Sequence, residues 1–143
     1  MATINPYLTF RGNCEEAFEF YRSQFGGEFA VMMRMNEIDC GAPVPADAEN
    51  LIMHIALPIK GNMLMGGDAP EGMGPQFVAG NNYSVSISAD SEEEGRRLFD
   101  GLSAGGNVMM PFADAFWGGL FGMFTDKFGV RWTVAFDKRQ QPA

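Results

Sequence analysis

The strongest constraint on this chain is that one pattern of residues occurs twice. In the first copy, the alternating apolar stretch at 7–10 predicts a strand, and Asn13 suits the N-cap of a helix with Glu15 and Glu16 in its first turn. Apolar residues then recur at helical spacing until the double glycine at 26–27, which predicts the end of the helix. These signals return in the same order later in the chain, so the sequence indicates two similar modules.

The second copy begins with strict alternation at 83–88, which predicts another strand. Asp90 or Ser91 then caps a helix that opens with three glutamates and ends at the double glycine at 105–106. Each predicted helix is therefore preceded by one short strand.

Three more strands are expected after each helix. In the first module they are predicted at 29–35, 51–59 and 63–65, with a surface loop at 37–50. In the second, a strand at 108–111 and a bend at 112–119 lead into an apolar hairpin at 116–136, whose turn is 126–129. The order in both modules is βαβββ.

These boundaries predict one domain spanning residues 1–143. Module 1 covers about 5–66 and module 2 about 82–137, and a loop rich in glycine and proline at 66–82 joins them. This loop is too short to be a linker between independent cores and too long for an ordinary turn.

The charge of the chain argues against two kinds of partner. Its formal net charge is −8, and its ten lysines and arginines form no basic cluster, so neither nucleic acid nor an anionic membrane surface is expected. The N-terminus lacks the features of a signal peptide, and no apolar stretch is long enough to span a bilayer. The cysteines, Cys14 and Cys40, fit no zinc or redox motif, so we expect a reduced, cytoplasmic protein.

Five separated words in this sequence resemble a known family. They are PYLTF, GNCEEAFEFY, FGGEF, NMLMGGDAP and FWGGLFGMFTDKFGVRW, and they span about 6–136. The chain resembles the vicinal oxygen chelate superfamily, which includes glyoxalases, bleomycin-resistance proteins and dioxygenases. It is most similar to the PhnB-like branch, whose members are often labelled 3-demethylubiquinone-9 3-methyltransferase. The resemblance implies an α+β fold of two tandem βαβββ modules forming a cup-shaped mixed sheet, with a small molecule in the cup and a homodimer.

The superfamily resemblance also implies four positions for metal ligands. Matching the motifs places Pro6 and Met65 there in the first module, and Tyr83 and Thr133 in the second. Histidine and carboxylate ligands are missing from this set, and these side chains are poor ligands for a hard or borderline dication. We therefore expect no metal and no other cofactor.

Two residues are candidates for catalysis. His54 is the only histidine of the chain, and an imidazole on a strand facing the cup could act as a general base. Asp68 follows the fourth strand of the first module. The alternative is a structural role for each, with His54 as a hydrogen-bonded core or rim residue.

Four residues are candidates for ligand contact: Trp117, Phe112, Met110 and Met65. An indole flanked by glycine could close over a flat ligand, and the chain's eleven methionines would suit an adaptable apolar cavity. Core packing explains the same residues equally simply. Three cations in or beside predicted strands, Arg34, Arg131 and Lys60, could hold an anionic ligand or could face water.

The sequence leaves three functions open. Small-molecule binding, as in bleomycin-resistance proteins, is favoured because the metal ligands are missing. An enzyme of unknown reaction on a small metabolite, such as a glyoxalase-like lyase, is the alternative. The methyltransferase activity with which relatives are labelled is the third, but no glycine-rich turn leads from a strand into a helix, as a Rossmann-type S-adenosylmethionine site would require.

Overall fold

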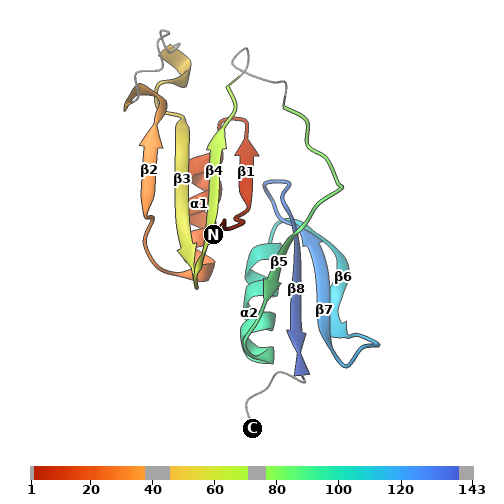
Figure 1. Cartoon of the computed structure of the whole chain (residues 1–143). Helices are drawn as coiled ribbons and strands as arrows, with labels where there is room; N and C mark the ends of the chain where they lie inside the picture. The colour runs from red at the N-terminus through yellow and green to blue at the C-terminus, as the bar shows by residue number, and fades with distance from the viewer. Residues whose placement is uncertain (1, 38–45, 71–76, 139–143) are drawn as a thin grey trace. The chain divides into compact units, whose positions relative to one another are not determined.

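The computed structural model describes residues 2–37, 46–70 and 77–138. The chain divides into two compact units, Met1–Val78 and Ala79–Ala143. Each unit contains one of the two predicted modules, and each is described here by itself (Figure 1).

The first unit has one α-helix and a four-stranded sheet in the order β1-β4-β3-β2. Two short 3₁₀ helices follow β2: η1 begins at the end of the strand predicted at 29–35, and η2 lies within the expected surface loop at 37–50. The elements are β1 (Tyr7–Phe10), α1 (Cys14–Phe25), β2 (Val31–Arg34), η1 (Met35–Glu37), η2 (Ala46–Ala48), β3 (Ile52–Ile59) and β4 (Asn62–Asp68).

The second unit repeats this arrangement, with its sheet in the order β5-β8-β7-β6. Its elements are β5 (Val85–Ser88), α2 (Glu92–Ser103), β6 (Asn107–Asp114), β7 (Gly119–Thr125) and β8 (Arg131–Asp137). In both sheets the first strand pairs in parallel with the last, while the other neighbours are antiparallel. The predicted α+β fold of two tandem βαβββ modules is confirmed.

Two strands are longer than the sequence predicted. β4 continues past Met65 through a pair of glycines to Asp68. These glycines are needed there, because a Cβ atom on Gly66 would lie 2.7 Å from the carbonyl oxygen of Leu8 on β1. β6 continues to Asp114, so the bend expected at 112–119 begins only after that residue.

The core of each unit lies between its helix and its sheet. In the first unit, Phe18 and Tyr21 of α1 are fully buried, and Phe18 contacts Phe10 of β1 edge to face. In the second, Phe99 of α2 contacts Phe124 of β7 at a ring-centroid distance of 5.1 Å. Burial of such aromatic side chains is the main source of stability in small domains.

One helix packs against each sheet and covers one of its faces. In Figure 1, α1 lies behind the first sheet, so the viewer sees the face that carries no helix. Side chains alternate between the two faces along a strand, so residues next to buried core positions belong to this second face. We call it the helix-free face. In the first sheet it includes Tyr7, Thr9, Met33, His54, Met65 and Gly67.

No helix among the described residues is long and apolar enough to cross a bilayer. This agrees with the absence of any long apolar stretch in the sequence.

Candidate ligand-binding faces

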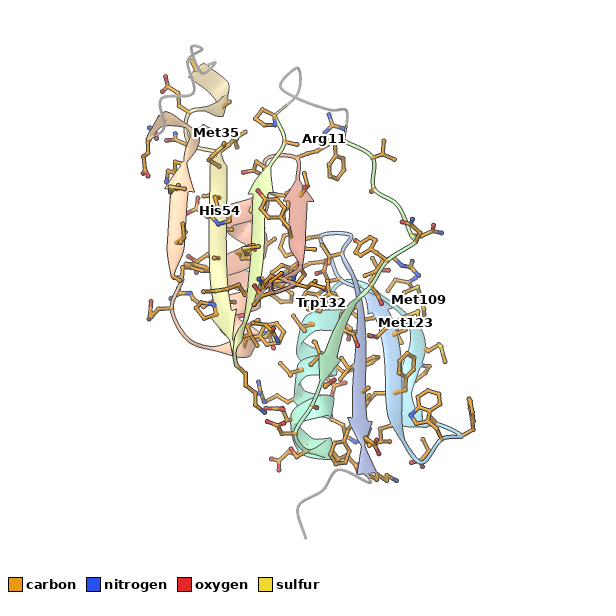
Figure 2. All side chains as sticks on the ribbon, in the orientation of Figure 1. Arg11, Met35, His54, Met109, Met123 and Trp132 are labelled. Carbon is orange, nitrogen blue, oxygen red and sulfur yellow. The ribbon has the colours of Figure 1, made fainter. Side chains whose placement is uncertain are left out.

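The most distinctive feature of the first helix-free face is a stacked pair of rings. Tyr7 on β1 and His54 on β3 have ring centroids 6.0 Å apart and planes inclined by 13°. Figure 2 shows His54 on β3, on the side of the sheet that faces away from α1. Tyr7 is 51% exposed and His54 is half-buried, so neither ring belongs to the core.

A glycine on the strand between them makes this pair possible. β4 separates β1 from β3, so the Tyr7 ring must cross β4 to reach His54. A Cβ atom on Gly67 of β4 would lie 2.7 Å from the Tyr7 hydroxyl oxygen and 2.7 Å from the carbonyl oxygen of Met53. Only glycine leaves space for the phenol at this point.

The phenol of Tyr7 is protonated near neutral pH. Partial burial of the hydroxyl group raises the pKa of Tyr7 further above its ordinary value, and the nearby Asp68 carboxylate acts in the same direction. Tyr7 therefore presents a hydrogen-bond donor beside the imidazole, which can accept or donate according to its protonation state.

Methionine side chains flank the ring pair. Met33 lies directly opposite His54 in the β2–β3 ladder and is 38% exposed. Met65, predicted as a ligand contact, pairs with Tyr7 across the β1–β4 ladder and is half-buried. This face combines two polar rings with thioethers, a mixture that suits a flat, largely apolar ligand with a few polar groups.

Asp68, the second candidate for catalysis, has clear structural contacts instead. Its carboxylate accepts hydrogen bonds from the backbone N–H groups of Gly12 at 2.8 Å, Cys14 at 3.0 Å and Ile52 at 2.8 Å. Asp68 is 9% exposed. The geometry therefore favours a structural role, in which Asp68 joins the start of α1 and the start of β3 to the end of β4.

Phe112 lies on the helix side of the second sheet and not on its helix-free face. Its ring stacks on Phe99 of α2 at a centroid distance of 5.8 Å, and the Arg96 guanidinium lies 5.4 Å from its centroid. Phe112 is 7% exposed. These contacts favour the core-packing interpretation over ligand contact.

Trp117 and Met110, the other two predicted ligand contacts, are accessible in the second unit. Trp117 follows β6 and contacts the exposed ring of Phe116 and the ring of Phe121 on β7, with centroids 5.0 and 5.6 Å away. It is 42% exposed, and Met110 is 49% exposed. Both therefore remain candidates for ligand contact.

The three cations singled out in the sequence have different environments. Arg34 forms two hydrogen bonds with the Glu15 carboxylate, at 2.9 and 2.8 Å, and thus links β2 to α1. Lys60 lies in the turn between β3 and β4. Arg131 begins β8, and its buried Nε atom has no hydrogen-bond partner. Cys40, which fits no zinc or redox motif, lies outside the described residues.

The four positions at which the superfamily would place metal ligands do not suit a dication. Proline and methionine offer no oxygen or imidazole at Pro6 and Met65, while the Tyr83 hydroxyl already accepts a hydrogen bond from the Arg131 N–H group at 3.3 Å. Thr133 is 6% exposed and pairs with Ser86. Within the described part of the chain, no group of three or more histidine, cysteine, aspartate or glutamate residues could hold a metal ion. The donor set therefore does not fit the superfamily's metal.

Sequence reasoning missed Tyr7, which the structure places beside His54. The signal was available, because Tyr7 alternates with Leu8 and Phe10, both of which are buried. A period of two places Tyr7 on the opposite face from the core. Its contact with His54, however, joins residues on strands that are not adjacent, and alternation alone does not predict it.

Comparison with known proteins agrees with this architecture. The fosfomycin resistance protein FosX from Listeria monocytogenes has a similar fold, with a TM-score of 0.63 at 10% identity over 93% of this chain and 91% of that one. This likeness concerns the fold alone, and it agrees with the tandem βαβββ arrangement that the superfamily resemblance implied.

Closer similarity identifies the branch. The family model described as 3-demethylubiquinone-9 3-methyltransferase matches residues 2–135. Protein YjdN of Escherichia coli (strain K12) is 32% identical over 146 residues, which cover 96% of this chain and 97% of that protein. The chain belongs to this family, as its PhnB-like sequence words predicted.

Two solved structures are also similar over nearly their whole length. Protein PA1353 from Pseudomonas aeruginosa is 39% identical with a TM-score of 0.84, covering 96% of this chain and 98% of that one. A putative 3-demethylubiquinone-9 3-methyltransferase, PhnB protein, from Bacillus cereus is 27% identical with a TM-score of 0.75, covering 94% and 99%.

Proposed function

We propose that this protein binds a small organic molecule against the helix-free face of its first sheet, with Tyr7 and His54 as the central contacts and without the superfamily's metal. The observation that carries the proposal is the ring pair itself, stacked over Gly67 and partly exposed. The ring pair is partly exposed and also requires glycine at position 67. Core packing alone does not account for this combination.

The chemistry of this face selects a class of ligand. The two stacked rings offer a flat apolar surface, and the thioethers of Met33 and Met65 can adapt to a ligand's edges. The Tyr7 hydroxyl and the imidazole can form hydrogen bonds with a phenol, carbonyl or amide of the ligand. We therefore expect a flat molecule with one or two polar groups.

The single histidine makes this proposal directly testable. Because the chain contains one histidine, the imidazole proton signals in NMR spectra report only on His54. Titration with the neutral probe 2-naphthol should shift these signals to saturation, because an aromatic ring on this face alters the local ring current. Tyr7→Ala should weaken probe binding at least tenfold, equivalent to about 1.4 kcal/mol.

Phe116→Ala provides the matched control, because Phe116 is an exposed aromatic residue of the second unit. It should leave the titration of His54 unchanged. His54 signals that do not move with 2-naphthol, or a Tyr7→Ala variant that binds as well as the parent, would exclude this face as the binding site.

Metal content tests the second part of the proposal. Because the four positions offer no good donor set, the purified protein should contain no stoichiometric zinc, nickel, iron or manganese. Elemental analysis of protein purified without chelators measures this. One tightly held ion per chain would contradict the proposal and restore a metal-dependent mechanism.

An enzyme acting on the same kind of molecule is the second candidate, and the Tyr7–His54 pair favours it. An imidazole base beside a protonated phenol could remove a proton from a substrate and stabilise the resulting oxyanion. In this case His54→Gln would lower kcat for the true substrate far more than it raised KM, whereas a residue that only binds the molecule would change mainly KM.

The methyltransferase activity in the family description needs a methyl donor. Gly66 and Gly67 lie within β4, where they allow close approach of Leu8 and Tyr7, so they form no cofactor turn. Calorimetric titration with S-adenosylmethionine should therefore show no binding. Saturable binding of this cofactor would favour the methyltransferase.

The resemblance to the superfamily also leads us to propose a cytoplasmic homodimer. Light scattering should then give twice the chain mass of 15.7 kDa. A mass equal to that of one chain would exclude the dimer.

A further inference from the structure

We propose that Arg131 binds an anionic group, a carboxylate, phosphate or phosphonate, of a small molecule on the helix-free face of the second sheet. This inference concerns the second unit alone and does not depend on ligand binding beside His54. It begins from one unusual atom: the Nε atom of Arg131 is buried and has no hydrogen-bond partner.

Three arginines that form ion pairs provide a contrast. Arg22, Arg34 and Arg96 each pair with at least one glutamate, at distances of 2.8 to 3.5 Å. Arg131 takes part in no ion pair that the structure shows among the described residues. A buried donor of a charged group normally has a partner, because leaving it unpaired costs free energy. An arginine that lacks one is available to an external anion.

The strand register places Arg131 on the helix-free face. Its neighbour Trp132 lies opposite Phe124, which contacts α2, and Trp132 is itself fully buried. Alternation therefore directs Arg131 away from the helix, onto the face that also carries Thr125 on β7 and Thr133 on β8.

Hydroxyl groups accompany the guanidinium on this face. Thr125 lies directly opposite Arg131, and its hydroxyl is 3.9 Å from the sulfur of Met109. Ser86 of β5 pairs with Thr133. The Tyr83 hydroxyl accepts a hydrogen bond from the backbone N–H group of Arg131 and still has its own proton to donate.

In the part of the chain that the structure describes, Arg131 forms no ion pair with the two aspartates nearest to it in sequence. Asp126 precedes β8, but its carboxylate accepts hydrogen bonds from the N–H groups of Phe128 and Val130 and from the Trp132 indole. Asp137 is at the other end of the strand, about 20 Å along it at ~3.3 Å per residue. Because the net charge of the chain is −8, its mean electrostatic field repels anions. An anion therefore binds here only through specific contacts with the Arg131 guanidinium.

Phenylphosphonate is a suitable probe, because it combines a dianionic group with one aromatic ring. The ¹⁵N signal of the Arg131 Nε–H group, assigned by its absence in Arg131→Lys, should shift to saturation during titration. Arg131→Met, which keeps an unbranched apolar stem but removes the guanidinium and its charge, should weaken binding at least tenfold. The matched control Arg97→Met removes an exposed arginine of α2 and should bind as the parent does.

Thermal stability separates ligand binding from a structural role. Because the Nε atom has no partner in the protein, Arg131→Met should melt at the same temperature as the parent or higher. A lower melting temperature would show that the arginine supports the fold and would overturn the proposal. The proposal would equally fail if the Nε–H signal did not move with millimolar phenylphosphonate, or if Arg97→Met weakened binding as much as Arg131→Met.

Discussion

At the scale of single residues, each unit has a buried aspartate that holds the backbone, at the end of β4 in the first unit and in the β7–β8 turn in the second. Asp126 accepts two backbone hydrogen bonds in the β7–β8 turn and one from the Trp132 indole. Asp68 accepts three, from segments that lie 16 to 56 residues away in the sequence. An aspartate near the end of a strand looks like a catalytic candidate in the sequence, whereas its partners identify it as part of the scaffold.

Asp68→Ala should lower the free energy of unfolding by about 3 kcal/mol, because it leaves several buried N–H groups without an acceptor. Urea denaturation followed by circular dichroism measures the change. Asp114→Ala is the matched control: this carboxylate is 78% exposed, and its loss should change stability by no more than about 0.5 kcal/mol. A loss below about 1 kcal/mol for Asp68→Ala would contradict the scaffold role.

The Arg34–Glu15 pair predicts a small dependence of stability on pH. Hydrogen bonds from the Arg34 guanidinium lower the pKa of Glu15 below its ordinary value. A lowered pKa stabilises the folded state above the unfolded-state pKa of about 4.3, and this contribution is lost as pH falls through the folded-state pKa. Because Glu15 is 46% exposed, we expect a contribution below about 1 kcal/mol.

Comparison with Glu15→Gln isolates this contribution. The parent should be the more stable protein in urea denaturation at pH 7, and the difference should disappear near pH 3. A difference that persisted at pH 3 would show that shape or hydrogen bonding, and not the charge of Glu15, is responsible.

At the scale of elements, the two helices begin in different ways despite similar sequences. Ser91 caps α2, since its hydroxyl accepts a hydrogen bond from the Glu94 N–H group at 3.1 Å. Asn13 occupies the N-cap position of α1, but its side chain forms no cap hydrogen bond. The Asp68 carboxylate accepts the Cys14 N–H group there instead.

Ser91→Ala should therefore cost about 1 kcal/mol of stability, whereas Asn13→Ala should cost no more than about 0.5 kcal/mol. Thermal denaturation of the two variants beside the parent protein tests this contrast. Equal losses would show that the Asn13 side chain contributes to α1 in solution.

The strands show the same division between local pattern and tertiary contact. Alternation predicted β5 closely, at 83–88 in the sequence and Val85–Ser88 in the structure. The predicted fourth strand was too short, because Gly66 and Gly67 resemble turn residues. Close approach of β1 to β4 is what requires glycine at Gly66, and a single strand considered alone does not contain that information.

At the scale of the whole molecule, the prediction that residues 1–143 form one domain can be tested by unfolding. Both tryptophans, Trp117 and Trp132, lie in the second unit, so tryptophan fluorescence reports on that unit alone. Phe18→Ala removes a fully buried ring from the first unit at a cost of about 3–5 kcal/mol.

If the chain unfolds as one domain, Phe18→Ala should move the fluorescence-monitored transition as far as the one monitored by circular dichroism. Phe124→Ala, in the core of the second unit, is the parallel control. It should shift both the fluorescence transition and the circular dichroism transition. A fluorescence transition that Phe18→Ala leaves in place would mean that the units unfold independently.

The candidate site was predictable only in part. His54, Met65, Trp117 and Met110 were selected from the sequence and lie at exposed or half-buried positions, so they stay candidates. Phe112 and Asp68 were selected by the same reasoning, but their contacts favour packing and backbone support. A strand sequence tells which residues share a face, but not which of the two faces the helix covers.

The sequence by itself determined the repeated βαβββ order, the positions of both helices and the family, because each depends on local periodicity, caps and ordered motifs. Only the tertiary structure decided that Tyr7 stacks on His54, that Asp68 supports α1 and that the Nε atom of Arg131 is unpaired. The physical reason is that these features join residues distant in the chain, whose contacts follow from strand order and helix packing and leave no local pattern.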